Sequence, residues 1–255
     1  METQSFLERA GGVLFRWRSF TPVPLLLIAL PLLWRSRGPA SPLWLVAGFA
    51  LCLCGQALRG WVIGQVPDGT SGQNERLIAT ELNTSGPYSH TRNPLYLGNF
   101  GITLGLCVAA HSLALIALVA LLFGLQYRAI IAAEERFLRG QFGAAFDQFC
   151  ARVPRFWPQL HGAPSARPRT FSLRRAVRKE HNPLAAWAGL LILFAALDRA
   201  AVVRERNASP RSLLPYAWAL LVLGVAYLLV KGWKHRWFSG GFIEDLRRRM
   251  RESAR

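Results

Sequence analysis

The chain has 255 residues, of which 52% are hydrophobic and 18% charged, with a formal net charge of +17. The apolar residues form five long runs without charged side chains, which excludes an ordinary soluble domain because one small core cannot bury them all. Ten of the 31 Lys and Arg residues lie between Arg136 and Lys179, and eight lie between Lys231 and Arg255. Because this charge flanks apolar runs, it indicates cytoplasmic membrane flanks on anionic lipid head groups and excludes nucleic acid as the partner.

Each of four apolar runs is suited to one transmembrane helix: Ser19–Trp34, Pro42–Leu58, Asn182–Leu197 and Ser212–Val230. A fifth run, Asn93–Tyr127, would be roughly 50 Å long as one helix, against a hydrocarbon core of about 30 Å. We therefore expect two helices that fold back at residues 109–112, Ala-Ala-His-Ser. The expected fold class is all-α, a polytopic membrane protein with about six transmembrane helices, a central helical hairpin and cytoplasmic amphipathic segments.

This pattern divides the chain into four parts. Residues 1–66 are expected to form an amphipathic leader in the membrane interface and two spans, and residues 67–158 the core that contains the hairpin. Residues 159–181 are a basic cytoplasmic linker, and residues 182–255 form a C-terminal hairpin and a basic tail. Asn182-Pro183 is expected to open a helix in the same way as Asn93-Pro94, with Asn at the cap and Pro at the first position.

The basic flanks also predict the orientation. With six spans, they place both termini and residues 132–182 in the cytoplasm. We expect a multi-pass integral protein of a prokaryotic inner membrane. One loop does not fit this orientation, because it would place Arg204, Arg206 and Arg211 on the side of the membrane opposite the cytoplasm. Arg59, near the end of its span, is expected to extend toward the interface. None of the four cysteines has metal-site spacing, so no metal is predicted.

Ionisable residues gather at one end of the expected hairpin. Arg92, Asn93 and Tyr96 begin its first helix, and Arg128, Glu134 and Glu135 lie at the end of its second. Since the connection is short, these two ends must be adjacent, and ionisable groups at membrane depth indicate a functional site. Each residue alone also has a plain structural explanation, such as a flanking charge or an interfacial aromatic ring.

Five motifs follow one another in this region: Gly86-Pro-Tyr88, Arg92-Asn-Pro-Leu-Tyr96 with Gly98, Glu134-Glu135-x-x-Leu138, Phe142-Gly143-x-x-Phe146-x-x-Phe149, and Arg155-Phe-Trp-Pro158. Together they resemble the family of membrane methyltransferases that includes isoprenylcysteine carboxyl methyltransferases and phospholipid N-methyltransferases. The resemblance covers roughly residues 80–158. It implies an S-adenosylmethionine-dependent methyltransferase that acts at the membrane, on its cytoplasmic side, on a lipid or prenylated acceptor.

The resemblance also implies roles for particular residues. Arg92, Tyr96 and Glu135 are the expected catalytic residues. The cofactor-binding residues are expected to be Gly86, Tyr88, His90, Arg92, Asn93, Pro94, Tyr96, Glu134 and Glu135. Chemically, the Arg92 guanidinium suits the carboxylate of S-adenosylmethionine, and Glu134 or Glu135 suits its ammonium or ribose hydroxyls. Phe142, Phe146 and Phe149 either wall the adenine or pack in the core.

This chain departs from the family at two places. The family usually has His at the position of Asn93, and often Tyr at the positions of Phe146 and Phe149. Two other classes of protein also stay open. One is a membrane transporter, although the apolar runs hold almost no ionisable residue near the midplane. The other is a catalytically inactive structural member of the same family. The sequence does not separate a carboxylate acceptor from an amine acceptor.

Overall fold

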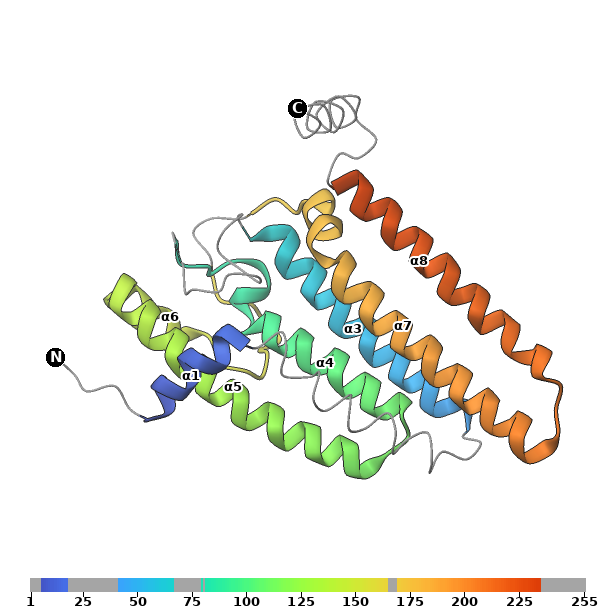
Figure 1. Ribbon diagram of the computed structural model, residues 1–255. Helices are drawn as coiled ribbons and strands as arrows, with labels where there is room; N and C mark the ends of the chain where they lie inside the picture. Colours follow the sequence, from blue (N-terminus) through green and yellow to red (C-terminus); the bar gives the residue numbers. More distant parts are fainter. Residues whose placement is uncertain (1–5, 18–40, 67–78, 80, 165–168, 235–255) are drawn as a thin grey trace, which may run out of the picture.

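The computed structural model describes residues 6–17, 41–66, 79, 81–164 and 169–234, and these residues contain helices and no strands (Figure 1). The α-helices are α1 (Phe6–Trp17), α3 (Pro42–Gln65), α4 (Pro94–Ala109), α5 (Leu113–Phe142), α6 (Ala144–Arg152), α7 (Leu173–Arg206) and α8 (Leu214–Lys234). Two single-turn 3₁₀ helices complete the set, η1 (Gly86–Ser89) and η2 (Pro210–Leu213). The predicted all-α class is thus confirmed.

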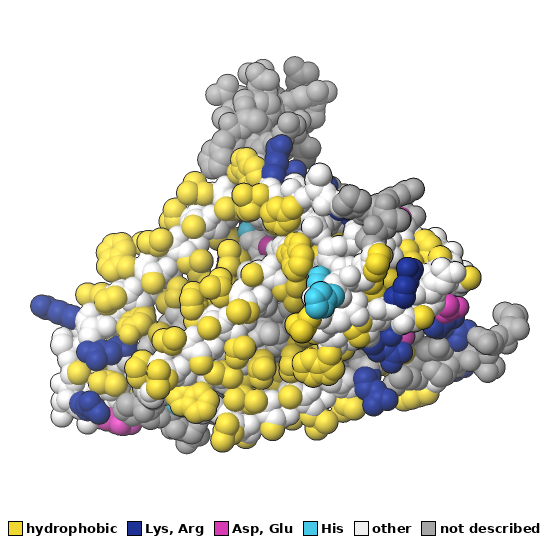
Figure 2. Space-filling view, turned by 180° about the vertical axis from the view of Figure 1, so that it is seen from behind, with side chains coloured by type: hydrophobic (Ala, Val, Ile, Leu, Met, Phe, Trp, Pro, Cys, Tyr) yellow, Lys and Arg dark blue, Asp and Glu magenta, His cyan; other side chains and the backbone are white. Residues whose placement is uncertain are grey.

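Four of these helical segments are long and apolar enough to cross a membrane: Pro42–Gln65, Leu113–Phe142, Leu173–Arg206 and Pro210–Lys234. Helix α4 is apolar but has only 16 residues. At 1.5 Å per residue it is about 24 Å long, short of a hydrocarbon core of about 30 Å. The expected count of about six spans is therefore not confirmed, and the expected span Ser19–Trp34 lies outside the described residues. Hydrophobic side chains cover the face in Figure 2, as lipid contact requires.

The predicted central hairpin is confirmed at both ends. Helix α4 ends at Ala109 and α5 begins at Leu113, with the Ser112 hydroxyl accepting a hydrogen bond from the Leu115 amide. His111 takes a left-handed conformation, with φ of 43°, which lets the chain reverse within three residues. Helix α5 continues through Glu134 and Glu135 to Phe142 and stops at Gly143, where φ is 50°. The hairpin therefore brings the start of α4 close to the end of α5.

Helices α3 and α4 touch backbone to backbone through paired glycines. A Cβ atom added at Gly55 would lie 2.6 Å from the carbonyl oxygen of Gly98, and one added at Gly48 would lie 2.5 Å from that of Gly105. Helix packing in lipid depends on such small residues, because burial of apolar surface gives no advantage there. These glycines fix the distance between α3 and the hairpin.

We expect Gly55→Ala to lower the free energy of unfolding by about 1–3 kcal/mol, because the added methyl group overpacks the α3–α4 contact. Gly60→Ala, in the same helix, is the matched control, since no atom lies within 4 Å of its added Cβ. That control should gain up to about 1 kcal/mol from helix propensity. Denaturant unfolding in detergent measures both, and a shift of the same sign in the two variants would contradict the close packing.

Helix α7 differs from the expectation. It runs unbroken from Leu173 to Arg206, with Ser172 at its N-cap and Pro183 inside it, so the expected helix start at Asn182-Pro183 is wrong. Proline in a helix interior removes one backbone hydrogen bond. Contacts on both sides offset this loss, because Glu180 and Trp187 each bond to side chains of α3. The second half of the expected linker 159–181 is therefore helical.

The outer helices have different surroundings. Helix α1, the described part of the expected leader, crosses α5, and a Cβ added at its Gly11 would lie 2.0 Å from the Ala129 carbonyl oxygen. Its Phe15 is buried with Tyr96, Tyr127 and Ile130. Helix α1 therefore has a protein-facing side as well as the interfacial one expected. Helix α8 packs against α7 at the edge of the molecule in Figure 1.

Candidate functional site

Two distant segments are joined beside the start of α4. The Arg92 amide donates to the Pro154 carbonyl at 2.9 Å, and the Gln159 amide donates to the His90 carbonyl at 3.0 Å. The buried Thr91 hydroxyl donates to the Phe156 carbonyl at 2.9 Å. These hydrogen bonds hold the segment that follows α6 alongside the segment that precedes α4. They explain why the Arg155-Phe-Trp-Pro158 motif accompanies the Arg92-Asn-Pro-Leu-Tyr96 motif.

A charged cluster lies where these segments meet the end of α5. Glu135 accepts from Arg92 Nη1 at 2.9 Å and from Arg155 Nε and Nη2 at 3.0 and 2.6 Å. The side chains of Arg92 and Glu135 are 14% and 10% exposed, whereas that of Arg155 is 60% exposed. The buried Arg92–Glu135 pair is therefore the stronger element, because solvent screens the Arg155 contact. With two guanidinium groups and one carboxylate, the cluster keeps one net positive charge.

Arg92 has hydrogen-bonding capacity left within this cluster. Its Nη1 also contacts the Cys150 sulfur at 2.7 Å, but its buried Nε has no hydrogen-bond partner among the described atoms. A buried donor without a partner costs free energy, and such a group in a native protein usually marks a ligand or a water position. Burial raises the pKa of the Cys150 thiol although Arg92 opposes this shift, so Cys150 is a neutral neighbour.

Tyr96 and Glu134 form the second part of the site. The Tyr96 hydroxyl donates to Glu134 Oε1 at 2.6 Å, which links the start of α4 directly to the end of α5. The Tyr96 ring meets the Tyr127 ring edge-on with centroids 4.6 Å apart. The expected adjacency of the two helix ends is thus confirmed. Arg128, expected at the same end, lies exposed on α5 and is not joined to the cluster by a described contact.

The residues that precede α4 are held by their backbone conformation and by packing against neighbouring segments. Gly86 has φ of 59°, and a Cβ there would meet the side chain of Gln65 at the end of α3. Tyr88 packs against the buried pair Phe146 and Phe149. Burial, with the nearby Glu134 carboxylate, raises the pKa of Tyr88 well above its ordinary value, so its hydroxyl stays protonated. His90 Nδ1 lies 2.8 Å from the Gln159 carbonyl oxygen, which makes this nitrogen the protonated one.

Asn93 is the N-cap residue of α4 and Pro94 its first residue, as predicted. The Asn93 side chain makes no capping hydrogen bond, however, and its Nδ2 donates to the Arg155 carbonyl at 2.8 Å. Asn93 therefore ties the helix start to the segment that carries Arg155. Phe146 and Phe149 are 1% and 5% exposed within their own cluster, which agrees with the core-packing alternative rather than with an open aromatic wall.

Two features are not predicted from the sequence. Arg155 belongs to the Arg155-Phe-Trp-Pro158 motif but lies outside the expected site, and its contact with Glu135 depends on the hydrogen bonds that join the segment after α6 to the segment before α4. A buried polar network between α3, α4 and α7 was also missed. Arg59 forms a two-bond pair with Glu180, Nε to Oε2 and Nη2 to Oε1, both at 2.8 Å. Arg59 thus turns inward instead of toward the interface as expected.

The same network continues from the Arg59–Glu180 pair in two directions, through α3 to Trp187 of α7 and through α4 to Tyr127 of α5. Glu180 also accepts from Gln56 Nε2 at 2.9 Å, and the Gln56 Oε1 accepts from the Trp187 indole at 2.9 Å. On the other side Arg59 Nη1 donates to Asn99, whose Nδ2 donates to the Tyr127 hydroxyl at 3.1 Å. Every link joins two different helices. The network therefore fastens α7 to the hairpin that carries the site.

Fold and site together define a helical membrane protein with a partly buried cluster of arginine, glutamate and tyrosine side chains at one end of a two-helix hairpin. Residues 43–145, from α3 to the start of α6, match the family model for phospholipid methyltransferases, which confirms the resemblance drawn from the motifs. The match leaves out Arg155 and the α7–α8 hairpin.

Two curated relatives are similar over a shorter stretch. The nickel-cobalt-cadmium resistance protein NccN of Alcaligenes xylosoxydans xylosoxydans is 44% identical over 82 residues, which are 32% of this chain and 38% of that protein. The cobalt-zinc-cadmium resistance protein CzcN of Cupriavidus metallidurans is 47% identical over 79 residues, 31% of this chain and 36% of that protein. The matched part thus spans just over a third of either relative. No solved structure matches this chain.

Proposed function

We propose that this protein is an S-adenosylmethionine-dependent methyltransferase that acts at the membrane on a lipid or prenylated acceptor. The observation that supports it most is the buried Arg92–Glu135 pair, joined by Arg155 and adjoining the Tyr96–Glu134 pair. Arg92, Tyr96 and both glutamates lie within the stretch that matches phospholipid methyltransferases. The site is proposed to face the cytoplasm of a prokaryotic inner membrane, where the basic flanks meet anionic head groups.

The residues present fit the expected cofactor. The unpartnered Nε of Arg92 suits a carboxylate. Glu134, the neighbouring carboxylate, suits an ammonium group or ribose hydroxyls. Glu135 already accepts from two arginines, so its part is to hold Arg92 in position, which revises the ammonium role considered for it from sequence. The cofactor supplies a methyl group carried on a sulfonium.

The chain's own contribution is alignment and exclusion of water. We expect positioning of donor and acceptor to dominate, because the positive charge of the sulfonium disperses in the transition state and no new charge has to be stabilised. Tyr88 stays neutral and acts as a hydrogen-bond donor, since its raised pKa excludes it as a base at neutral pH. A carboxylate acceptor needs no base, whereas an amine acceptor loses its proton to the Tyr96–Glu134 pair.

The test is incubation of the purified full chain with methyl-labelled S-adenosylmethionine and a total lipid extract or a prenylated cysteine. We expect label in the lipid-soluble fraction. Release of labelled methanol by mild base identifies a methyl ester, and base-stable label identifies an N-methyl product. Arg92→Ala should remove the label, whereas Arg128→Ala, an exposed arginine of α5, should retain it. Absence of label together with no effect of S-adenosylmethionine on thermal unfolding would reject the proposal.

A second candidate, a membrane transporter, is favoured by one observation. The buried Arg59–Glu180 pair places ionisable groups inside helices that suit membrane spans, where the apolar runs alone had indicated almost none. Among the described residues no group of three or more His, Cys, Asp or Glu side chains suits a metal ion. Flux of a labelled solute into liposomes without S-adenosylmethionine would favour this candidate.

A further inference from the structure

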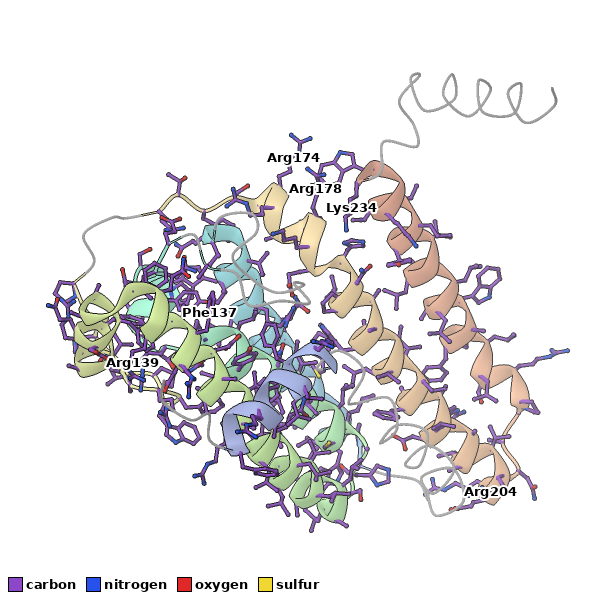
Figure 3. The ribbon with its side chains drawn as sticks, turned by 60° about the vertical axis from the view of Figure 1, so that its left-hand side comes forward. Phe137, Arg139, Arg174, Arg178, Arg204 and Lys234 are labelled. Atoms are coloured by element: carbon purple, nitrogen blue, oxygen red, sulfur yellow. The ribbon has the colours of Figure 1, made fainter. Side chains whose placement is uncertain are left out.

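Four basic side chains converge where the start of α7 meets the end of α8: Arg174, Arg178, Lys231 and Lys234. Figure 3 shows Arg174, Arg178 and Lys234 together at this corner, with Arg204 at the opposite end of the hairpin. The Arg174 guanidinium lies 5.5 Å from the Trp233 ring centroid, and Lys231 Nζ lies 5.5 Å from that of Tyr227. The corner therefore combines cations with aromatic rings from both helices.

Among the residues that the structure describes, no carboxylate balances the charge of this corner. None of the four basic side chains forms an ion pair within the part of the chain that the structure describes. Close like charges repel one another, and in a folded protein such a group is normally offset by a bound anion or screened by solvent. The corner is therefore complementary in charge to an anion.

A buried histidine supplies the second observation. His181 is 7% exposed, and the backbone carbonyl groups of Val177 and Arg178 on its own helix act as hydrogen-bond acceptors toward its ring, although its Nδ1 makes no hydrogen bond of good geometry. Its ring stacks on that of Tyr227 with centroids 5.7 Å apart, and Lys231 lies over the same Tyr227 ring. Both Lys231 and Lys234 lie close enough to act on it electrostatically. An imidazole donor without a hydrogen bond of good geometry, close to a cluster of cations, suits a ligand with acceptor oxygens.

The surroundings suit a ligand that also carries acyl chains. Helix α8 has no buried residue in its apolar window and exposes Val225, Leu228 and Leu229 along the last two turns before the corner. Trp233, 45% exposed, has the place of an aromatic side chain at a membrane–water interface. A head group at the corner would therefore leave its acyl chains beside α8.

We propose that the α7–α8 corner is a specific site for one anionic phospholipid, whose phosphate contacts Arg178 and Lys234 and whose acyl chains lie along α8. Arg174 and Lys231 extend the positive surface around the phosphate, each held over an aromatic ring. Basic sites between helices at one membrane face bind anionic head groups in this way. The site is independent of methyl transfer and lies outside the matched residues 43–145.

The test uses the full chain in nanodiscs of phosphatidylcholine with increasing fractions of phosphatidylglycerol, with bound lipid counted by native mass spectrometry. We expect one retained phosphatidylglycerol, and roughly twentyfold weaker retention in Arg178→Gln/Lys234→Gln, since each cation near an anionic surface contributes about a factor of five. The matched control is Arg204→Gln/Arg211→Gln, two basic residues at the other end of the hairpin. This control variant should retain phosphatidylglycerol as strongly as the unchanged protein does.

Three outcomes would overturn the site: equal retention of phosphatidylcholine, an equal loss in both double variants, or displacement of the lipid by millimolar inorganic phosphate. The first shows a nonspecific apolar surface, the second general surface charge, and the third a soluble anion as ligand. His181→Phe keeps the ring stack on Tyr227 but removes the ring nitrogens. It should weaken phosphatidylglycerol retention without changing thermal unfolding in pure phosphatidylcholine, which separates ligand contact from folding.

Discussion

Glu180→Ala is expected to lower the free energy of unfolding by about 3–5 kcal/mol, because it leaves the buried guanidinium of Arg59 without its carboxylate. The same change removes the acceptor of Gln56 Nε2. The side chains of Arg59 and Glu180 are only 13% and 8% exposed, so solvent cannot replace the lost contacts. Reversible unfolding in mixed detergent micelles measures the change.

Two further variants make this expectation specific. Asp147→Ala breaks an ion pair of the same kind, Arg139 Nε to Asp147 at 2.8 Å, but its partners are 53% and 56% exposed. It should cost no more than about 1 kcal/mol. The double change Arg59→Met/Glu180→Met should recover most of the loss, because an apolar pair carries no desolvation penalty. An equal cost for Glu180→Ala and Asp147→Ala would mean that the network does not fasten α7.

Arg92→Ala is expected to weaken the binding of S-adenosylmethionine by at least about thirtyfold, since truncation of one partner of a buried charge contact typically costs 2–5 kcal/mol. The proposed contact is between its guanidinium and the cofactor carboxylate. Folding should change less, because Glu135 keeps two hydrogen bonds from Arg155. Titration calorimetry in detergent gives the affinity, and thermal unfolding reports the fold.

The chemistry of the guanidinium gives a graded series. Arg92→Lys keeps the charge but loses the planar fork, so its affinity should fall between those of the unchanged protein and Arg92→Ala. Arg128→Ala removes an exposed arginine of α5 and should leave affinity unchanged. If Arg92→Ala binds S-adenosylmethionine as well as the unchanged protein does, Arg92 is a structural residue and the proposed donor site is wrong.

Much of the hairpin was predictable because its signals are local. The length of the run Asn93–Tyr127 required a reversal, and Ser112 supplied a helix cap at the predicted place. Asn93 and Pro94 gave the start of α4. A short connection then forced Tyr96 and Glu134 together, as the 2.6 Å hydrogen bond between them confirms. Cofactor and acceptor, by contrast, rest on the resemblance and remain proposals.

The sequence alone also misplaced some elements. Asn182-Pro183 has the same local signal as Asn93-Pro94, yet α7 continues through it. The difference is tertiary, because Glu180 and Trp187 are bound to α3 on either side of Pro183 and keep the helix intact. Local propensity decides a helix boundary only where no such contacts compete.

What the sequence determined by itself was therefore the membrane class, the reversal of the hairpin and the residues gathered at its end, since apolar run length and turn residues act over a few positions. The tertiary structure alone decided which charges meet. Glu135 is joined to Arg155, 20 residues away, and Arg59 to Glu180, 121 residues away. These pairs form because helix packing excludes water and leaves each buried charge only the partner that a neighbouring segment brings to it.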